Sequence, residues 1–191
     1  MTLRLNGSTS GFTEIDAPAV AGSNTLVLPT GNGTNGQVLT TNGSGALSWT
    51  GMGPAFSAFR TANQTISNAV DTKIQLTGEL FDTANCFDST TNYRFTPNVA
   101  GYYNFSFGFN LTSSANVTNA IIGKIWKNGA ISKSSGYIYS GAGFVDGRAL
   151  SSGLIYMNGS TDYVELYSYV LGSGTLNVYN AVLEGYLARP A

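Results

Sequence analysis

Histidine is absent from this 191-residue sequence, and cysteine occurs once, at Cys86. Without histidine the chain cannot build a Ser-His-Asp or Cys-His nucleophile system, or a histidine-ligated metal site. A single cysteine also excludes a disulfide within the chain. No Lys or Arg lies beside Cys86 in the sequence to lower the pKa of its thiol. We therefore expect a small buried or loop thiol, not a nucleophile.

Charged residues are also scarce. They make up 10% of the chain, and nine basic against ten acidic side chains give a formal net charge of -1. The sequence contains no cluster of Lys and Arg of the kind that indicates nucleic-acid binding. No apolar run of roughly 18 or more residues indicates membrane insertion. Because long amphipathic helices usually carry many Glu, Lys and Arg, this composition, with its 24 glycines, favours an all-β protein.

Two regions of different composition follow one another, at residues 1–53 and 54–191. The first holds ten of the 24 glycines but only two aromatic residues, Phe12 and Trp49. Its turn-rich clusters separate short strand candidates at 12–16, 24–28, 37–41 and 46–49. The large apolar residues are too few to bury a core within one chain. We expect copies of the segment to intertwine and share their hydrophobic residues, although a disordered linker remains the alternative.

The second region has longer strands and more aromatic residues. The expected strands are 55–61, 72–77, 93–96, 102–111, 120–126, 130–134, 136–139, 148–157, 162–171 and 175–187. Asn128-Gly129 lies between two of them and is a strong hairpin signal. About ten short strands without a helical pattern predict a sandwich or jelly roll.

The stretch 93–111 is the most informative part of this region. After Gly101, large apolar residues occupy every second position, and Asn, Ser and Gly occupy the positions between them. Such alternation is typical of a half-buried strand. The large residues are Tyr103, Phe105, Phe107, Phe109 and Leu111. We expect their face to fill the core and the small polar face to meet a neighbouring layer or subunit.

Three stretches of the first region, 6–11, 17–29 and 36–49, resemble the shaft and attachment segments of bacteriophage tail fibres and related virion proteins. They cover nearly all of the first 50 residues. The resemblance implies a β-rich shaft or virion anchor that contacts other virion proteins through residues 1–53.

The second region resembles another family. The motifs FSAFR at 56–60, FD at 81–82 and 87–88, YRFT at 93–96, GYYNF at 101–105 and LEGYL at 183–187 are similar to those of the globular head shared by complement component 1q and the tumour-necrosis-factor superfamily. The resemblance covers residues 54–190 and implies a ten-stranded jelly roll that assembles as a tight homotrimer. No collagen stalk is present, so the collagen-linked partners of that family are not implied.

The resemblance and the alternation together give a set of residues expected in the core or in the trimer scaffold. These are Phe56, Phe95, Tyr103, Phe105, Phe107, Phe109 and Tyr186.

Receptor-contact candidates come from the stretch 135–148, which is rich in Tyr, Ser and Gly. These residue types are common in adaptable recognition surfaces, and tyrosine rings can stack on sugars. The candidates are Tyr137, Tyr139, Phe144, Asp146 and Arg148. The period-two spacing of the two tyrosines favours the alternative that they simply pack in the sandwich or at the trimer axis.

Metal and cofactor sites are not expected. Asp82 and Asp88 flank a loop that could offer oxygen ligands to calcium, which some members of the family bind. Their spacing matches no calcium loop, so turn hydrogen bonds are the better interpretation. No cofactor is indicated.

These observations predict a non-enzymatic, homotrimeric virion adhesin whose head binds a host-surface glycan or envelope component. Two alternatives remain: a structural decoration fibre, and a depolymerase that cuts surface polysaccharide. The ten acidic residues form no motif that favours the depolymerase. Residues 1–8 lack the apolar core of a secretory signal, so release by host lysis, or excision from a longer protein, fits the sequence.

Overall fold

The computed structural model describes residues 3–20, 22–115, 118–138 and 146–191; for 118–119 and 136–138 it describes the backbone alone. The chain forms two compact units, Met1–Met52 and Gly53–Ala191. Throughout the described ranges the regular structure is β, and none of it is helical. Accordingly, no helix in these ranges is long and apolar enough to cross a membrane.

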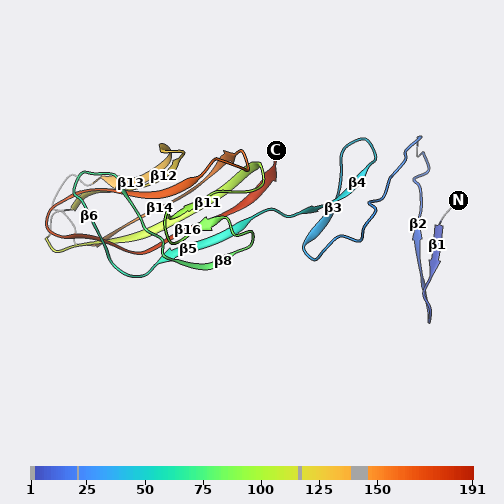
Figure 1. The fold of residues 1–191 in the computed structure, drawn as a ribbon, viewed down its shortest axis with the longest axis horizontal. Helices are drawn as coiled ribbons and strands as arrows, with labels where there is room; N and C mark the ends of the chain where they lie inside the picture. Colours follow the sequence, from blue (N-terminus) through green and yellow to red (C-terminus); the bar gives the residue numbers. More distant parts are fainter. Residues whose placement is uncertain (1–2, 21, 116–117, 139–145) are drawn as a thin grey trace. The chain divides into compact units, whose positions relative to one another are not determined.

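The N-terminal unit consists of two hairpins (Figure 1). Strand β1 (Leu3–Asn6) pairs with β2 (Phe12–Ile15), and β3 (Gln37–Thr41) pairs with β4 (Leu47–Gly51). Sequence reasoning missed β1, although leucines alternate with polar residues there. The strand expected at 24–28 does not form, and Val27 alone makes a parallel bridge to Ala46. One residue of bridging is too little to order an extended strand.

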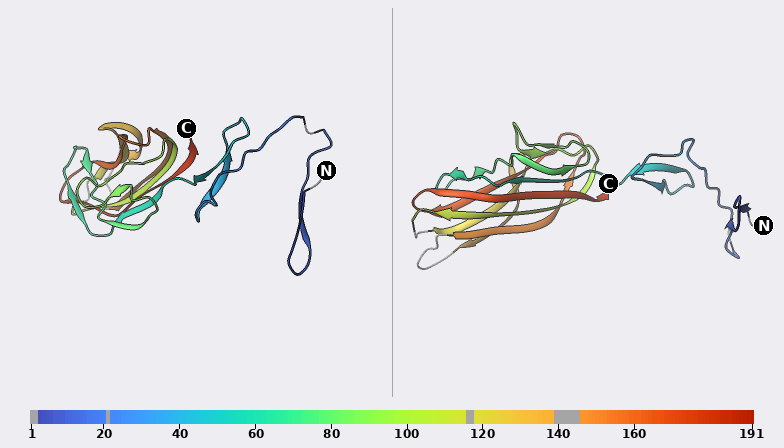
Figure 2. Two further views of the ribbon diagram at one scale, coloured as in Figure 1. Left: turned by 45° about the vertical axis from the view of Figure 1, so that its right-hand side comes forward. Right: turned by 90° about the horizontal axis from the view of Figure 1, so that it is seen from below.

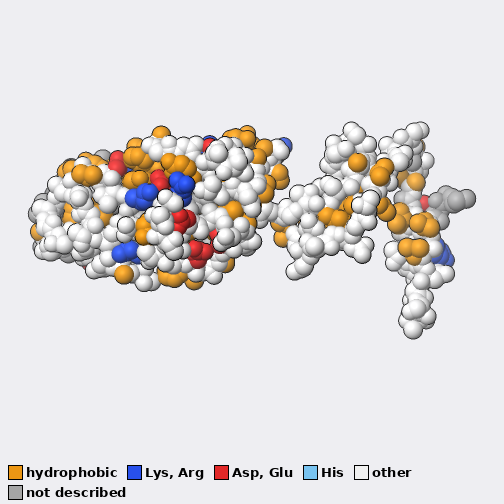
Figure 3. Space-filling view, in the orientation of Figure 1, with side chains coloured by type: hydrophobic (Ala, Val, Ile, Leu, Met, Phe, Trp, Pro, Cys, Tyr) orange, Lys and Arg blue, Asp and Glu red, His pale blue; other side chains and the backbone are white. Residues whose placement is uncertain are grey.

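No described residue of the N-terminal unit is buried. Its large apolar side chains are exposed, for example Ile15 at 63% and Val20 at 93%, and they are visible as orange patches in Figure 3. The indole of Trp49 donates a hydrogen bond to the Gly31 carbonyl at 2.7 Å. A Cβ at Gly33 would lie 2.7 Å from the Trp49 ring, so glycine is required at that position. The unit is therefore held by hydrogen bonds and local contacts and lacks a core of its own.

The described residues of the C-terminal unit form twelve strands. They are β5 (Ala55–Arg60), β6 (Gln64–Ile66), β7 (Thr72–Lys73), β8 (Gly78–Asp82), β9 (Phe87–Asp88), β10 (Arg94–Phe95), β11 (Gly101–Ser113), β12 (Thr118–Lys127), β13 (Ala130–Ile138), β14 (Asp146–Met157), β15 (Val164–Gly172) and β16 (Leu176–Pro190).

These strands form two sheets. One runs in the order β14-β11-β16-β5-β8, with β6 attached to β16. The other runs β13-β12-β15-β10-β9, with β7 attached to β15. The sheets lie as two layers of a sandwich, best seen in the right-hand view of Figure 2. The expected all-β sandwich is confirmed. Each sheet has five strands in continuous order and one short strand attached to one of them.

The shorter strands were the ones that sequence reasoning missed or misplaced. Strands β6, β8 and β9 were not predicted. The strand expected at 72–77 is reduced to the two residues of β7, and the two strands expected at 130–134 and 136–139 form one strand, β13, as far as Ile138. Two- to five-residue strands are too short for alternation to appear, because each offers only one or two side chains per face.

Aromatic rings fill the space between the sheets. Phe56 stacks on Phe95 with ring centroids 4.3 Å apart. Phe95 in turn meets Tyr103 and Phe105 edge-on at 5.6 and 5.9 Å. The Tyr103 hydroxyl donates to the Val99 carbonyl at 2.8 Å, so its one polar group has a partner. Edge-on and offset pairs of this kind add stabilisation beyond the area they bury.

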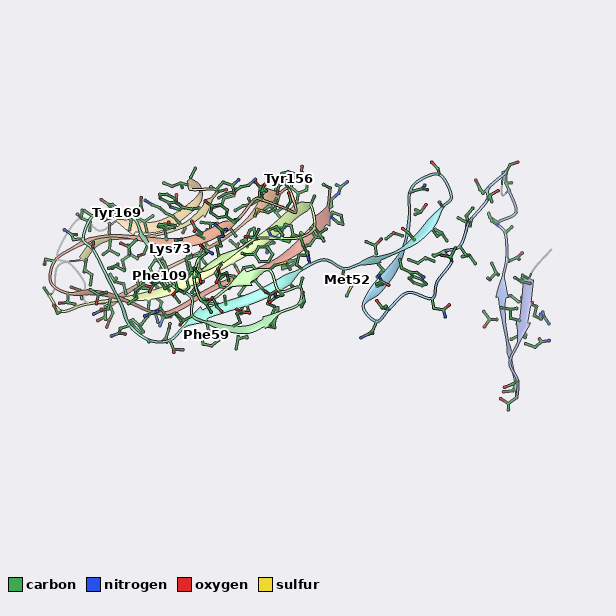
Figure 4. The ribbon with its side chains drawn as sticks, viewed as in Figure 1. Met52, Phe59, Lys73, Phe109, Tyr156 and Tyr169 are labelled. Carbon is green, nitrogen blue, oxygen red and sulfur yellow. The ribbon has the colours of Figure 1, made fainter. Side chains whose placement is uncertain are left out.

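Burial along β11 follows the predicted alternation. Tyr103, Phe105, Phe107 and Phe109 all point into the core and are at most 4% exposed; Phe109 is labelled in Figure 4. Across the core, a Cβ at Gly123 would lie 2.1 Å from the Phe107 ring. Glycine on β12 thus makes room for the aromatic row on β11.

Replacing Phe95 tests this core. We expect Phe95→Ala to lower the free energy of unfolding by about 3–5 kcal/mol, because the cavity would leave three ring contacts unmade. Phe95→Leu, which fills more of the volume, should cost less. Urea denaturation of both variants measures the difference. A loss below about 1 kcal/mol for the alanine variant would contradict a central role for this ring.

Candidate binding surfaces

The predicted receptor residues lie on two edge strands or outside the described residues. Tyr139 and Phe144 belong to the undescribed segment. The backbone of Tyr137 lies in β13, opposite Ile121 of β12. Asp146 and Arg148 begin β14, where both are exposed and pair with Thr112 and Asn110 of β11. Their part in receptor binding stays a prediction.

The outer face of the β14-β11-β16-β5-β8 sheet carries exposed apolar side chains, most of them on its edge strands β14 and β8. We call this the apolar outer face and define it by Phe81, Tyr102, Leu150, Leu154, Tyr156 and Tyr186.

Strand register brings these side chains together. Tyr102 pairs with Tyr156, and their rings lie edge-on at 5.5 Å. Asn104 lies between Leu154 on one side and Tyr186 on the other. Leu154 is 56% exposed and Tyr186 52%. Contiguous exposed apolar residues on a sheet are typical of an interaction surface.

Tyr186 therefore corrects one expectation. It was grouped with the core aromatic residues, but it alternates with the buried Gly185 and points out of the sandwich. Phe56, Phe95, Tyr103, Phe105, Phe107 and Phe109 do lie in the core. Within LEGYL the pairing with β11 is regular, so alternation places Tyr186 on the exposed face of Glu184, opposite the buried Leu183. The motif carried this signal, and sequence reasoning did not use it.

A cavity of about 280 Å³ opens on this face. Glu184 is the one charged residue in its lining, and its carboxylate accepts a hydrogen bond from the Ser57 hydroxyl at 2.9 Å. In the strand register Glu184 also lies opposite Ser106. A single carboxylate is thus surrounded by neutral groups.

The outer face of the other sheet has a different character. Lys73 pairs with Glu165 and Lys124 with Asp71, both at 2.5 Å. Trp126 stacks on Tyr167 with centroids 4.3 Å apart. Lys73 and Tyr169, also on this face, are labelled in Figure 4.

Lys73 and Lys124 on this second face are therefore paired with carboxylates within the chain, which distinguishes it from the apolar outer face. Burial raises the pKa of the Tyr167 hydroxyl, with the nearby Glu165 carboxylate acting in the same direction. Sequence reasoning missed this cluster. The signal was the alternation of Tyr163, Glu165, Tyr167 and Tyr169.

Asp82 and Asp88 are turn caps, as the sequence indicated. Asp82 accepts hydrogen bonds from the backbone N–H groups of Ala84 and Phe87. Asp88 accepts five, from the backbone of Thr90, Thr91 and Asn92 and from two of their side chains. Within the described ranges no three His, Cys, Asp or Glu residues gather as a metal-binding group.

Cys86 is a buried thiol close to these turns. Burial raises its pKa, so the thiol stays protonated at neutral pH. It lies 3.6 Å from the Ala84 carbonyl, to which it donates. This environment fits the structural role expected from the sequence.

A polar groove of about 480 Å³ lies where β8, β9 and β10 meet. Its lining comprises Glu79, Asn85, Cys86, Phe87, Asp88, Ser89, Thr90, Asn92, Arg94 and Thr96. No residue lines both this groove and the cavity around Glu184. Sequence reasoning missed this groove, because β8 and β9 were not predicted.

Comparison with solved structures identifies the fold of the C-terminal unit. The chain is similar to the globular domain of zebrafish complement 1qA protein, with a TM-score of 0.54, 19% identity, and coverage of 73% of this chain and 99% of that one. It is also similar to Eiger TNF from S. frugiperda, with a TM-score of 0.55, 10% identity, and coverage of 72% and 93%. No protein-family model matches the sequence, and no curated protein matches it.

These similarities confirm the expected fold: the head is a jelly-roll sandwich of the complement-1q and tumour-necrosis-factor type. At this level of identity they show the fold alone.

Asp88 gives a pH-dependent prediction. Hydrogen bonds from the backbone of Thr91 and Thr90 hold the pKa of the Asp88 carboxyl well below its usual value. Because the folded pKa is lowered, the stabilisation is complete above the ordinary pKa of about 4 and is lost as the pH falls through the folded value. We expect the native protein to be more stable than Asp88→Asn by a constant amount from pH 7 to pH 5.

Below about pH 4 this stability difference should narrow, because the Asp88 carboxylate of the unfolded chain begins to be protonated while that of the folded chain stays ionised. Urea unfolding of both proteins, at one protein concentration and across this pH range, measures it. A difference at pH 3 equal to that at pH 7 would contradict the assignment of Asp88 as an ionised turn cap.

Proposed function

We propose that this chain is a homotrimeric bacteriophage virion protein, of the tail-fibre or fibre-tip type, whose head attaches the particle to a host-surface glycan or envelope component. The observation that carries the proposal is the apolar outer face of the head. That face needs a partner, and a second copy of the same sheet is the partner that the complement-1q resemblance implies. We place the mature protein on the virion, outside the host after lysis.

Two features of the apolar outer face support self-association. Leu150, Leu154 and Tyr186 are each more than half exposed in the single chain. Burying such side chains stabilises an assembly by roughly 25 cal/mol per Å² of apolar area. The residues between them, such as Asn104 and Gly108, are small, so a neighbouring backbone can approach closely.

The N-terminal unit supports the same conclusion independently. It has no buried residue among those described, and both of its hairpins have unpaired strand edges. Copies that intertwine would pair these edges and bury residues such as Leu5, Phe12 and Ile15. Together with the tail-fibre resemblance of residues 1–50, this favours a shaft or anchor that docks on other virion proteins.

Adhesion follows from the assembly. Three identical heads on one fibre can contact a repetitive surface at the same time, which raises avidity by about 10²–10⁴ without high affinity at any single site. A decoration fibre would use the same trimer but would need no ligand. A depolymerase would need paired catalytic carboxylates, whereas Asp82, Asp88, Asp162 and Glu165 are engaged in turns and ion pairs.

The trimer is tested by a charge placed on the apolar outer face. We expect Leu154→Asp to convert the trimer to monomers, because the carboxylate would be buried between subunits without a partner. The matched control is Ile131→Asp, which changes an exposed residue on the β13 strand of the other sheet. Light scattering coupled to size-exclusion chromatography reports the mass. A monomeric native protein would refute the trimer.

Adhesion is tested by binding to envelope fractions prepared from candidate hosts. We expect the native trimer to bind and the Leu154→Asp monomer to bind at least 100-fold more weakly. A trimer that binds no fraction would favour the decoration fibre. New reducing ends released from host polysaccharide would instead identify a depolymerase.

A further inference from the structure

The polar groove between β8 and β10 contains side chains whose hydrogen-bonding groups are unused. In the described part of the chain, the side chains of Glu79, Asn85, Ser89 and Thr96 make no hydrogen bond, although all four line the groove. Asp88 and Asn92, by contrast, bond to each other within the turn. The groove therefore offers a ligand both hydrogen-bond donors and hydrogen-bond acceptors. The buried residues Phe87 and Cys86 also line it.

Arg94 adds a fixed cation at the edge of the groove. Its guanidinium lies over the Tyr163 ring, 4.3 Å from the centroid. No carboxylate in the described residues forms a salt bridge with it. Since the ring limits its motion, its N–H donors are held in place before a ligand arrives, which lowers the entropy cost of binding.

The backbone around the groove is also held in unusual conformations. Asn85 and Tyr93, at the two ends of the segment that carries β9, have φ angles of 54° and 51°. A tyrosine in the left-handed region is uncommon and costs free energy. The Asp88 turn, together with the Lys73 ammonium that donates to the Asn92 carbonyl at 3.2 Å, keeps the segment in this shape. Strain that is maintained in this way is frequent at ligand sites.

Charge decides the class of ligand. Two carboxylates, Glu79 and Asp88, face one guanidinium, Arg94, so the groove has a net negative charge and disfavours acidic ligands. Its many amide and hydroxyl groups suit a ligand rich in hydroxyl groups. Its volume lies within the range of about 300–1,000 Å³ that is usual for small-molecule sites.

We propose that this groove binds a neutral saccharide unit of the host-surface glycan. The proposal rests on the adhesive function proposed above and gives that function a site, one for each head. The site shares no lining residue with the cavity on the apolar outer face.

Titration of the full-length protein with methyl glycosides tests the proposal. The probes are the methyl glycosides of glucose, galactose, mannose and N-acetylglucosamine, and the acidic counterparts are methyl glucuronide and methyl galacturonide. The glucoside and the glucuronide differ only at C6, where the first has a hydroxymethyl group and the second a carboxylate. We expect at least one neutral glycoside to bind, and its acidic counterpart to bind at least tenfold more weakly. Ligand-observed NMR gives the affinities.

Two variants locate the site. Ser89→Trp fills the groove and should abolish binding. Asn85→Gly removes the amide but keeps the positive φ at low cost, and should weaken binding roughly fivefold through the loss of one hydrogen bond. The control is Thr61→Trp, which adds the same ring at an exposed position beyond the end of β5 opposite to Ala55. It should bind like the native protein.

Failure of the site can be separated from failure of the adhesive function. Absence of binding by every neutral glycoside, equal or tighter binding of the acidic ones, or unchanged binding by both groove variants would overturn the proposal. If the groove variants still adhere to host envelope as the native protein does, the adhesin remains and the groove is refuted as its receptor site. If sugars bind in the groove but no envelope fraction is bound, the site stands and the adhesive function fails.

Discussion

The stack of aromatic rings between the two sheets is the contact on which the head depends. Phe56, Phe95, Tyr103 and Phe105 come from three separated strands, β5, β10 and β11, and their rings meet at centroid distances of 4.3 to 6.4 Å. Because β11 lies inside its sheet, its inward rings fix the register of both neighbours. That register then determines which residues of β14 and β16 face outward.

The side chains on the two outer faces of the sandwich differ in whether they have partners within the chain. On the β12–β15 side, Lys73 and Lys124 find carboxylates within the same chain, and tryptophan and tyrosine stack on each other. On the β11–β16 side, leucine and tyrosine side chains remain exposed. The first face is complete in a monomer, whereas the second gains stability only when something covers it.

The two units differ in the same sense. The head buries a large aromatic core and can hold its own shape. The N-terminal hairpins bury no described residue. In the fibre proposed above, partner chains would supply the stability of the hairpins on assembly, and the folded head would be presented to a surface. The polar groove is formed entirely by residues of the head, so a single chain already has its geometry.

The sequence alone determined the features that rest on local patterns. The alternation from Tyr103 to Leu111 predicted both faces of β11, and Asn128-Gly129 predicted the β12–β13 turn, where both residues have positive φ. Tertiary structure decided the rest. The groove forms because β8, which pairs with β5 in one sheet, meets β9 and β10, which join the other sheet through β15. Strands β8 and β9 are two to five residues long and carry no periodic signal, so only the pairing of remote segments could place Arg94 over Tyr163.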